Sequence, residues 1–378
     1  MVGLLLALQA TVWLNFLNKL DSNDLISTMS KFLFASLFFI FNSSFSVQLN
    51  ANQGYSFDDT VFSDMHAHPS RFHRDHIDSI GLAEIELYLS QGMDLVVAAI
   101  STDMAFQGNY VTADGVIPRG KYKPLPGESY KLTMERLERI KKTSQHKKAV
   151  LALSPNDVLV AKDAEHLSII SAIEGADGLE GNIQNLYTFY EMGLRLIQLV
   201  HFRANKLGHV QSYPYSPGGL TKFGKEVVLE ANKLNIIIDI AHANTETILD
   251  VLEFSKDPVI FSHGGLKSLK DQDRALTDQE VILIAQKGGI VGIWPHGKYI
   301  ESVSVMVDYI EHVIKLVGPE HVGIGSDLRG VSKYSEGFGS DANFHSIVEE
   351  MTLRGYDKPT IGKVMGGNFF SLWQKVVN

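Results

Sequence analysis

Short apolar runs rich in β-branched residues alternate with longer amphipathic segments along the chain beyond residue 55. This alternation is typical of parallel α/β architecture, in which strands are buried on both faces and helices cover them. Eight of these runs predict strands at residues 61–66, 94–100, 167–174, 194–201, 235–242, 258–263, 288–294 and 321–327. A ninth, shorter run at residues 148–154 predicts a minor strand before a helix.

The longer segments carry apolar side chains at helical spacing. Residues 222–234 place Val227, Ala231 and Leu234 at i, i+4 and i+7, and residues 129–142 carry a similar stripe. No linker rich in Pro or Gly divides the chain. Eight alternations of strand and helix therefore predict a (β/α)8 barrel of the TIM type.

A barrel of this kind has its chemistry at the C-terminal ends of its strands. Polar side chains capable of chemistry follow the predicted strands here rather than precede them. A purely structural histidine has no reason to prefer that end, so the pattern predicts a metal or catalytic centre at the mouth of the barrel. These residues are His66, His68, Glu174, His201, His242, His263 and Asp327.

Five of these residues have the chemistry of metal ligands. His66 and His68 lie two apart at a strand end, so both imidazoles project to one face and can reach one ion. Glu174 ends a buried strand, where an ionised carboxylate is costly unless a cation or hydrogen bonds compensate it. It is therefore either a metal ligand, which could bridge two metals, or a cap of the following turn. His242 and His263 end consecutive strands, either as a second ligand pair or as satisfied core histidines.

Asp327 ends the last predicted strand, and barrel closure places it beside His66 and His68. It is a candidate ligand or general base, with the alternative of an Asp that caps the turn before Gly330. Neutral imidazole is the common zinc ligand, and a zinc site with open positions lowers the pKa of bound water towards neutrality. The pattern therefore predicts a hydroxide nucleophile.

Composition and net charge exclude several functional classes and several kinds of metal site. The chain has 378 residues, 45% of them hydrophobic, which is enough for a large buried core. A net charge of -9 without a long run of one sign argues against a nucleic-acid partner. The absence of cysteine excludes disulfides and thiolate metal sites and leaves His, Asp and Glu as ligands.

The N-terminal region has the pattern of a secretory signal. An apolar run at residues 32–41 follows Met29 and a lysine, and small residues up to Ser46 follow the run. We expect Met29 to be the natural start, residues 1–46 to be an extension with a signal peptide, and residues 47–378 to be one catalytic barrel. The protein is then exported, periplasmic or secreted; the alternative is that two apolar segments anchor it to a membrane.

Four stretches of the chain resemble segments of the membrane dipeptidase (renal dipeptidase) family, peptidase family M19: IEGADG, LVHFRAN, IIIDIAHANTETILDVLEFSKDPVIFSHGG and HVGIGSDLRGV. In that family a (β/α)8 barrel holds two zinc ions and cleaves dipeptides, and some members accept a D-residue at the C-terminal position. The resemblance implies that His66, His68 and Glu174 hold one zinc. It implies that Glu174, His242 and His263 hold the other.

The resemblance extends to two further positions. His201, in a His-x-x-x-Asn pattern with Asn205, matches a histidine that contacts the scissile group of the substrate and could stabilise an oxyanion. Arg274, eleven residues after His263, matches an arginine that pairs with the terminal carboxylate of the substrate. Without the resemblance, we would expect Arg274 to be a surface arginine, because several of its neighbours in the sequence are acidic.

Two positions depart from the family pattern. His68 stands where the family usually has Asp, which removes one negative charge from the first metal site. Arg329 stands where the family often carries an acid, so that DFDG becomes DLRG. We therefore expect changes in metal preference and in substrate preference.

The sequence as a whole predicts an exported, dinuclear zinc dipeptidase. A metal-bridging hydroxide attacks the scissile carbonyl, with Asp327 and His201 as catalytic residues and Arg274 and Asn205 at the substrate. One alternative is a related amidohydrolase that acts on N-acyl amino acids or lactones, and another is an inactive binding barrel. The partners expected are a dipeptide or other small amide, with a homodimer also open.

Overall fold

The computed structural model describes residues 57, 59–71, 77–106, 109–112, 115–118, 123–212 and 217–378. The chain divides into two units, Met1–Phe57 and Asp58–Asn378, and the second contains the fold described below. The predicted signal segment, the start at Met29 and the boundary at residue 46 lie outside the described residues.

Eight parallel strands form the barrel, and each one pairs with the next along the chain. The last strand returns to the first, because the N–H of Asp327 donates to the carbonyl of His66 (2.8 Å) and that of His68 donates to Leu328 (2.8 Å). The predicted (β/α)8 barrel is therefore confirmed. Its strands are β1 (Ser63–Ala67), β2 (Leu95–Ser101), β6 (Leu167–Glu174), β7 (Leu194–Gln198), β8 (Ile237–Asp239), β9 (Ile260–Leu266), β11 (Ile290–Ile293) and β12 (Val322–Ile324).

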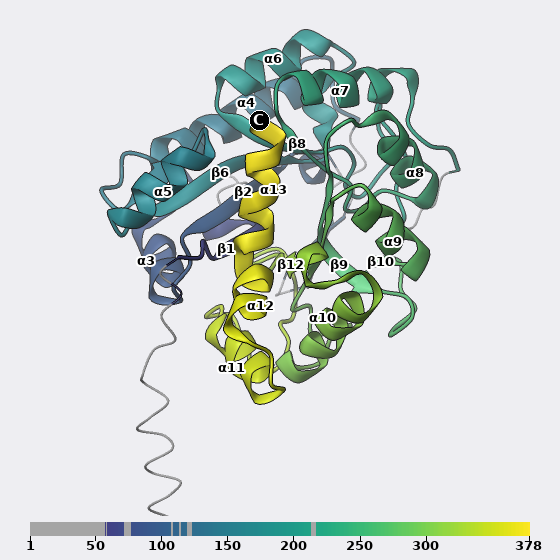
Figure 1. Ribbon diagram of the computed structural model, residues 1–378. Helices are drawn as coiled ribbons and strands as arrows, with labels where there is room; N and C mark the ends of the chain where they lie inside the picture. Colours follow the sequence, from purple (N-terminus) through teal and green to yellow (C-terminus); the bar gives the residue numbers. More distant parts are fainter. Residues whose placement is uncertain are drawn as a thin grey trace, which may run out of the picture. The chain divides into compact units, whose positions relative to one another are not determined.

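Helices alternate with the strands and surround them (Figure 1). Those predicted at residues 129–142 and 222–234 are α4 (Glu128–Thr143) and α7 (Lys222–Lys233). Hydroxyl or amide side chains cap many of the helices and accept a backbone N–H of the first turn, as Asn244 does for α8. The others are α3 (Leu82–Ser90), α5 (Pro155–Asp163), α6 (Ile183–Glu191), α8 (Thr245–Phe254), α9 (Asp278–Gln286), α10 (Val303–Val317), α11 (His345–Leu353), α12 (Lys358–Gly362) and α13 (Asn368–Val377).

Four short strands complete the sheet structure. The minor strand predicted at residues 148–154 is β5 (Ala149–Leu151), which pairs in parallel with the first residues of β6. β10 (Ala275–Leu276) pairs with the end of β9. The strands β3 (Asn109–Thr112) and β4 (Gly115–Pro118) form an antiparallel hairpin in the connection between β2 and α4.

The main apolar core lies toward the N-terminal ends of the strands. Apolar side chains that begin β2, β8, β9 and β11 form one cluster with α13, whose Trp373 is completely buried. Met65 is also buried there, and its Cε lies 3.1 Å from the position that a Cβ would take at Gly323. Packing at this end leaves the opposite end of the barrel to polar groups.

No helix within the described ranges is long and apolar enough to cross a membrane.

Candidate metal centre

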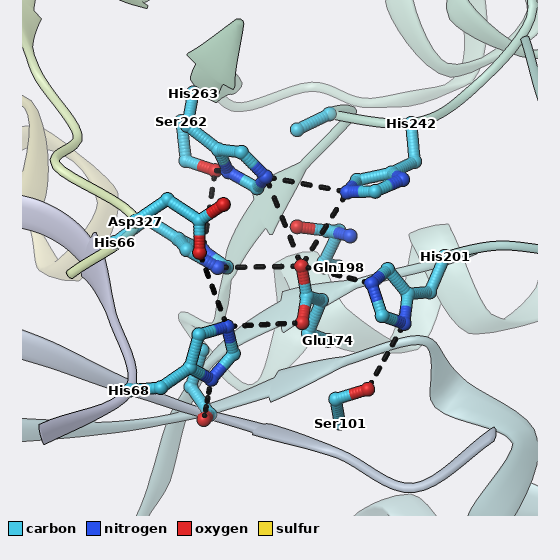
Figure 2. Close-up of polar contacts among 12 residues, drawn as sticks. His66, His68, Ser101, Glu174, Gln198, His201, His242, Ser262, His263 and Asp327 are labelled. Carbon is cyan, nitrogen blue, oxygen red and sulfur yellow. Dashed lines mark hydrogen bonds and ion pairs between the residues drawn. The ribbon is translucent and has the colours of Figure 1, made fainter. Parts of the chain in front are cut away.

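Seven polar residues predicted at strand ends converge at the C-terminal mouth of the barrel (Figure 2). Some lie inside the strands, as His66 and His263 do, and others follow the strand by a few residues, as His242 follows β8. All six histidine and glutamate side chains among them are buried. The seven are His66, His68, Glu174, His201, His242, His263 and Asp327.

Glu174 occupies the middle of this group. Its Oε1 lies 3.3 Å from Nε2 of His66, 3.3 Å from Nε2 of His201 and 3.4 Å from Nε2 of His242. Its Oε2 lies 3.4 Å from Nε2 of His68. Burial alone would raise the pKa of Glu174, but the surrounding imidazoles, His201 first, hold that pKa well below its usual range. Glu174 is therefore a buried, ionised carboxylate enclosed by ring nitrogens.

The donor atoms fit a divalent cation better than they fit one another. Nε2 of His66 and Oε2 of Glu174 are buried without a hydrogen-bond partner. Nε2 of His242 faces Nε2 of His263 at 3.2 Å. Burial holds the pKa of both these histidines well below its usual range, so both rings are neutral, which is the form that binds metals.

Among the described residues, the donors form three overlapping groups in which the candidate ligand atoms lie within 4.8 Å of one another. One group joins Glu174, His242 and His263, the set implied for one metal. A second joins His66 and His68 to Asp327, and the third joins His66 and His263 to Asp239. Glu174 is also within ion-pair distance of His66 and His68, so the carboxylates of Glu174 and Asp327 both face that histidine pair.

Hydrogen bonds at the outer ring nitrogens turn the Nε2 atoms inward. Nδ1 of His68 lies 2.9 Å from the carbonyl oxygen of Ala99, which can only accept, so Nδ1 carries the proton. The Ser262 hydroxyl lies 2.8 Å from Nδ1 of His263 and 3.5 Å from Nδ1 of His66. Such partners behind the ligands fix the ring orientation at metal sites.

Asp239 and Ser262 are two residues of this centre that the sequence analysis missed. Oδ1 of Asp239 accepts the backbone N–H of Ser262 (3.0 Å), whereas its Oδ2 has no hydrogen-bond partner. Burial raises the pKa of Asp239, and its carboxylate groups with His66 and His263 within 4.8 Å. The available signal was position, because Asp239 ends β8 and Ser262 immediately precedes His263.

Arg274 is buried beside the centre, and not on the surface as its sequence context alone indicated. One Nη2–H donates to the carbonyl of His263 (3.0 Å), and the guanidinium lies 5.0 Å from the centroid of the Trp294 ring. Burial lowers its pKa to about 10, so it stays charged at neutral pH. Nε has no hydrogen-bond partner. A buried cation in this state favours an anionic ligand.

His201 and Asn205 lie in the loop after β7. Nε2 of His201 faces Glu174, while its Nδ1 lies 2.7 Å from Oδ1 of Asp103. The Asn205 amide donates to Asp177 (3.2 Å) and to the carbonyl of Leu199 (2.9 Å), and so holds the loop together. Substrate contact by Asn205 stays a prediction.

Arg329, the second departure from the family pattern, forms a two-pronged ion pair with Glu84 of α3. Its Nε and Nη2 donate to the two carboxylate oxygens at 3.0 and 3.2 Å. A further donor reaches the carbonyl of Ser340 at 3.0 Å. Arg329 therefore ties the loop that carries Asp327 to the outer helices.

Comparison with known proteins gives one family. Residues 84–378 match the family model described as Membrane dipeptidase (Peptidase family M19). Dipeptidase 3 from Mus musculus is 27% identical over 261 residues, which cover 66% of this chain and 52% of that protein. Dipeptidase tcpJ from Claviceps purpurea is 30% identical over 216 residues, or 54% of this chain and 51% of that protein. The chain thus spans about half the length of these relatives.

A solved structure supports the same fold. The metallopeptidase from Rhodobacter sphaeroides, determined with a phosphinate mimic of the dipeptide L-Ala-D-Ala, superposes with a TM-score of 0.71. The match covers 84% of this chain and 99% of that one at 21% identity. With most of its length inside the family match, the chain belongs to the membrane dipeptidase family, peptidase family M19.

Proposed function

We propose that this protein is a metal-dependent dipeptidase. The observation that carries the proposal is the buried Glu174 carboxylate, enclosed by five imidazoles, with the buried Arg274 guanidinium close by. Such a site suits an amide substrate that ends in a free carboxylate. The M19 family membership and the dipeptide mimic bound to the Rhodobacter sphaeroides protein support this substrate class.

Two zinc ions are the cofactors that we propose. His66, His68 and Glu174 would hold one, and Glu174, His242 and His263 the other. Imidazole-rich donors favour zinc over magnesium or calcium, which prefer oxygen ligands. When bound, such metals polarise a carbonyl and make a water more acidic.

The remaining roles belong to residues of the chain. Asp327 stands at the edge of the centre, with Oδ1 3.4 Å from Nε2 of His68, where it can take a proton from water and pass it to the leaving amine. His201 faces the interior and would support the developing oxyanion. Arg274 would bind the terminal carboxylate of the substrate and set its orientation.

Chelation tests the proposal. We expect dipeptide hydrolysis to be lost on dialysis against a chelator and to return when zinc is added. Asp327→Asn should abolish turnover while metal content, measured by mass spectrometry, stays at the wild-type value. Full activity in the metal-free protein would refute the proposal.

A second candidate reaction is hydrolysis of N-acyl amino acids. These share the amide and the terminal carboxylate with a dipeptide but lack its free amine. His68 favours this candidate, because an imidazole there gives less negative charge to attract an amine than a carboxylate would. A panel of dipeptides and matched N-acyl amino acids separates the two by kcat/KM.

Export of the protein, supported by the apolar run at residues 32–41, stays part of the proposal.

A further inference from the structure

His201 is held from behind by an acid that the proposed mechanism does not use. Its ring is buried, with Nε2 facing Glu174 at 3.3 Å and Nδ1 facing Oδ1 of Asp103 at 2.7 Å. The two nitrogens of one imidazole thus point in opposite directions, one into the centre and one away from it. What Asp103 does to Nδ1 therefore determines what Nε2 presents to the centre.

Asp103 is itself fixed. It lies in the 3-10 segment Asp103–Phe106 after β2 and is completely buried. Oδ1 also accepts the Ser101 hydroxyl at 3.2 Å, and Oδ2 accepts the backbone N–H of Phe202 at 3.2 Å. Asp103 thus binds both the ring of His201 and the backbone N–H of Phe202, the residue that follows His201. These two contacts together fix the position of the His201 ring and of the backbone that carries it.

The chemistry of the acceptor places a proton on Nδ1 of His201. Burial would raise the pKa of Asp103, but His201 beside it lowers that pKa below its usual value, so Asp103 is an ionised carboxylate that can only accept. The Ser101 hydroxyl lies 2.9 Å from the same ring nitrogen (Figure 2). Because a hydroxyl can either donate or accept, Ser101 alone does not determine whether Nδ1 carries a proton.

We propose that Asp103 is a positioning residue that fixes the His201 ring by accepting its Nδ1–H, so that Nε2 is directed at the scissile group of the substrate. This inference rests on the proposed function. The Asp103 carboxylate lies directly against the His201 ring, with Oδ1 2.7 Å from Nδ1. We expect its effect on the reaction to pass through that ring, as the effect of an acid behind a catalytic histidine does in other hydrolases.

The substitution Asp103→Asn, compared with Asp94→Asn, tests the inference. Asp94 lies at the opposite end of β2 from Asp103 and is largely buried. Its carboxylate accepts the backbone N–H of Phe62 (2.9 Å), and each of its two oxygens accepts a hydrogen bond from Nζ of Lys162 (3.0 and 2.9 Å). We expect D103N to lower kcat by about 10²-fold with KM and zinc content within twofold of wild type, as a small misplacement of a catalytic group does. D94N should lower thermal stability without changing kcat.

A double mutant separates positioning from a general structural effect. Because Asp103 acts through His201, D103N should cause no further loss of kcat in a His201→Ala background. An equal loss of kcat in both backgrounds would overturn the inference, as would a D103N kcat within twofold of wild type.

Nitrogen-15 NMR of the histidines gives a readout that does not depend on activity. In zinc-loaded wild type, the His201 signals, assigned by their loss in His201→Ala, should report a proton on Nδ1, and D103N should lose that pattern. A proton on Nε2 alone in wild type would overturn the inference, and this measurement needs no folded variant at position 103. If wild type hydrolyses no dipeptide, the proposed function fails while the NMR result still decides the role of Asp103.

Discussion

Burial and outer hydrogen bonds prepare the individual histidines of the centre. His242 and His263 are neutral because burial penalises the imidazolium form. The Nδ1–H of His68 donates to the carbonyl of Ala99, and its Nε2 lies 3.4 Å from a carboxylate oxygen of Glu174 and 3.4 Å from one of Asp327. Burial disfavours the imidazolium form of His68, but the two carboxylates, Glu174 first, raise its pKa. A positive charge at this point, either a proton on Nε2 or a metal ion, therefore stabilises the arrangement.

We expect His68 to affect the metal preference of the centre. Replacement by Asp would exchange an imidazole nitrogen for a harder, charged oxygen, which favours manganese relative to zinc. We expect His68→Asp to decrease the preference for zinc over manganese by about tenfold, equivalent to about 1.4 kcal/mol, in competition titrations followed by metal analysis. The control His146→Asp lies beyond the end of α4, away from the centre, and should keep the wild-type ratio. An unchanged ratio in His68→Asp would contradict this role.

Sequence reasoning found the inward-facing residues of the centre and missed those behind them. His242 and His263 were recognisable because each ends an apolar run, and strand ends in a barrel share one mouth. Asp103 and Ser262 contact the outer nitrogens of His201 and His263, and Asp239 accepts the backbone N–H of Ser262. These contacts depend on packing between strands, which spacing along the chain does not reveal.

Among the elements, close contact between strands supports β9, which carries the candidate ligand His263. A Cβ at Gly292 of β11 would lie 2.6 Å from the carbonyl carbon of Ser262 and 2.7 Å from Cε of Met65. Gly325, after β12, approaches the same peptide: a Cβ there would lie 2.9 Å from that carbonyl carbon. The absence of two side chains thus lets three segments meet around the residue that orients His263.

Gly292→Ala should therefore disturb both the fold and the site. We expect the free energy of unfolding to fall by about 1–3 kcal/mol, the usual cost of overpacking, and zinc affinity to fall with it. Urea unfolding and zinc titration measure the two effects. Gly81→Ala is the matched control, since the nearest atom to its Cβ would be Oγ of Ser70 at 3.5 Å. Equal stability of the two variants would contradict this account of β11.

All eight barrel strands were predictable, because each is a buried apolar run of strand length. Three of them end three residues earlier than predicted: β7 at Gln198, β8 at Asp239 and β12 at Ile324. Beyond these points the backbone leaves the ladder, and at His242 and Asp327 it takes positive φ values of 67° and 47°. Sequence periodicity carries no signal for such turns, nor for a strand of two residues such as β10.

At the scale of the whole molecule, the barrel separates stability from chemistry. The apolar cluster with α13 lies toward the N-terminal ends of the strands, and the polar centre lies at the C-terminal ends. Glu174 and its histidines contribute no apolar packing to that cluster. Variants in α13 should therefore act on folding and leave the composition of the centre unchanged.

Trp373 tests this separation. Trp373→Ala should lower the free energy of unfolding by about 3–5 kcal/mol, since it removes a completely buried ring. Trp373→Phe should cost less, because Nε1 of Trp373 is buried without a hydrogen-bond partner and its removal relieves that penalty. Urea unfolding of the metal-free protein measures both. A larger loss in the Phe variant, or an altered zinc stoichiometry in folded Trp373→Phe, would contradict this account.

Anomalous diffraction at the zinc absorption edge, from crystals of the zinc-loaded protein, would locate the metal ions directly. We expect two peaks about 3.5–4 Å apart on either side of the Glu174 carboxylate, one beside His66 and His68 and the other beside His242 and His263. A single peak, no peak, or zinc bound away from Glu174 would refute a dinuclear centre built on Glu174.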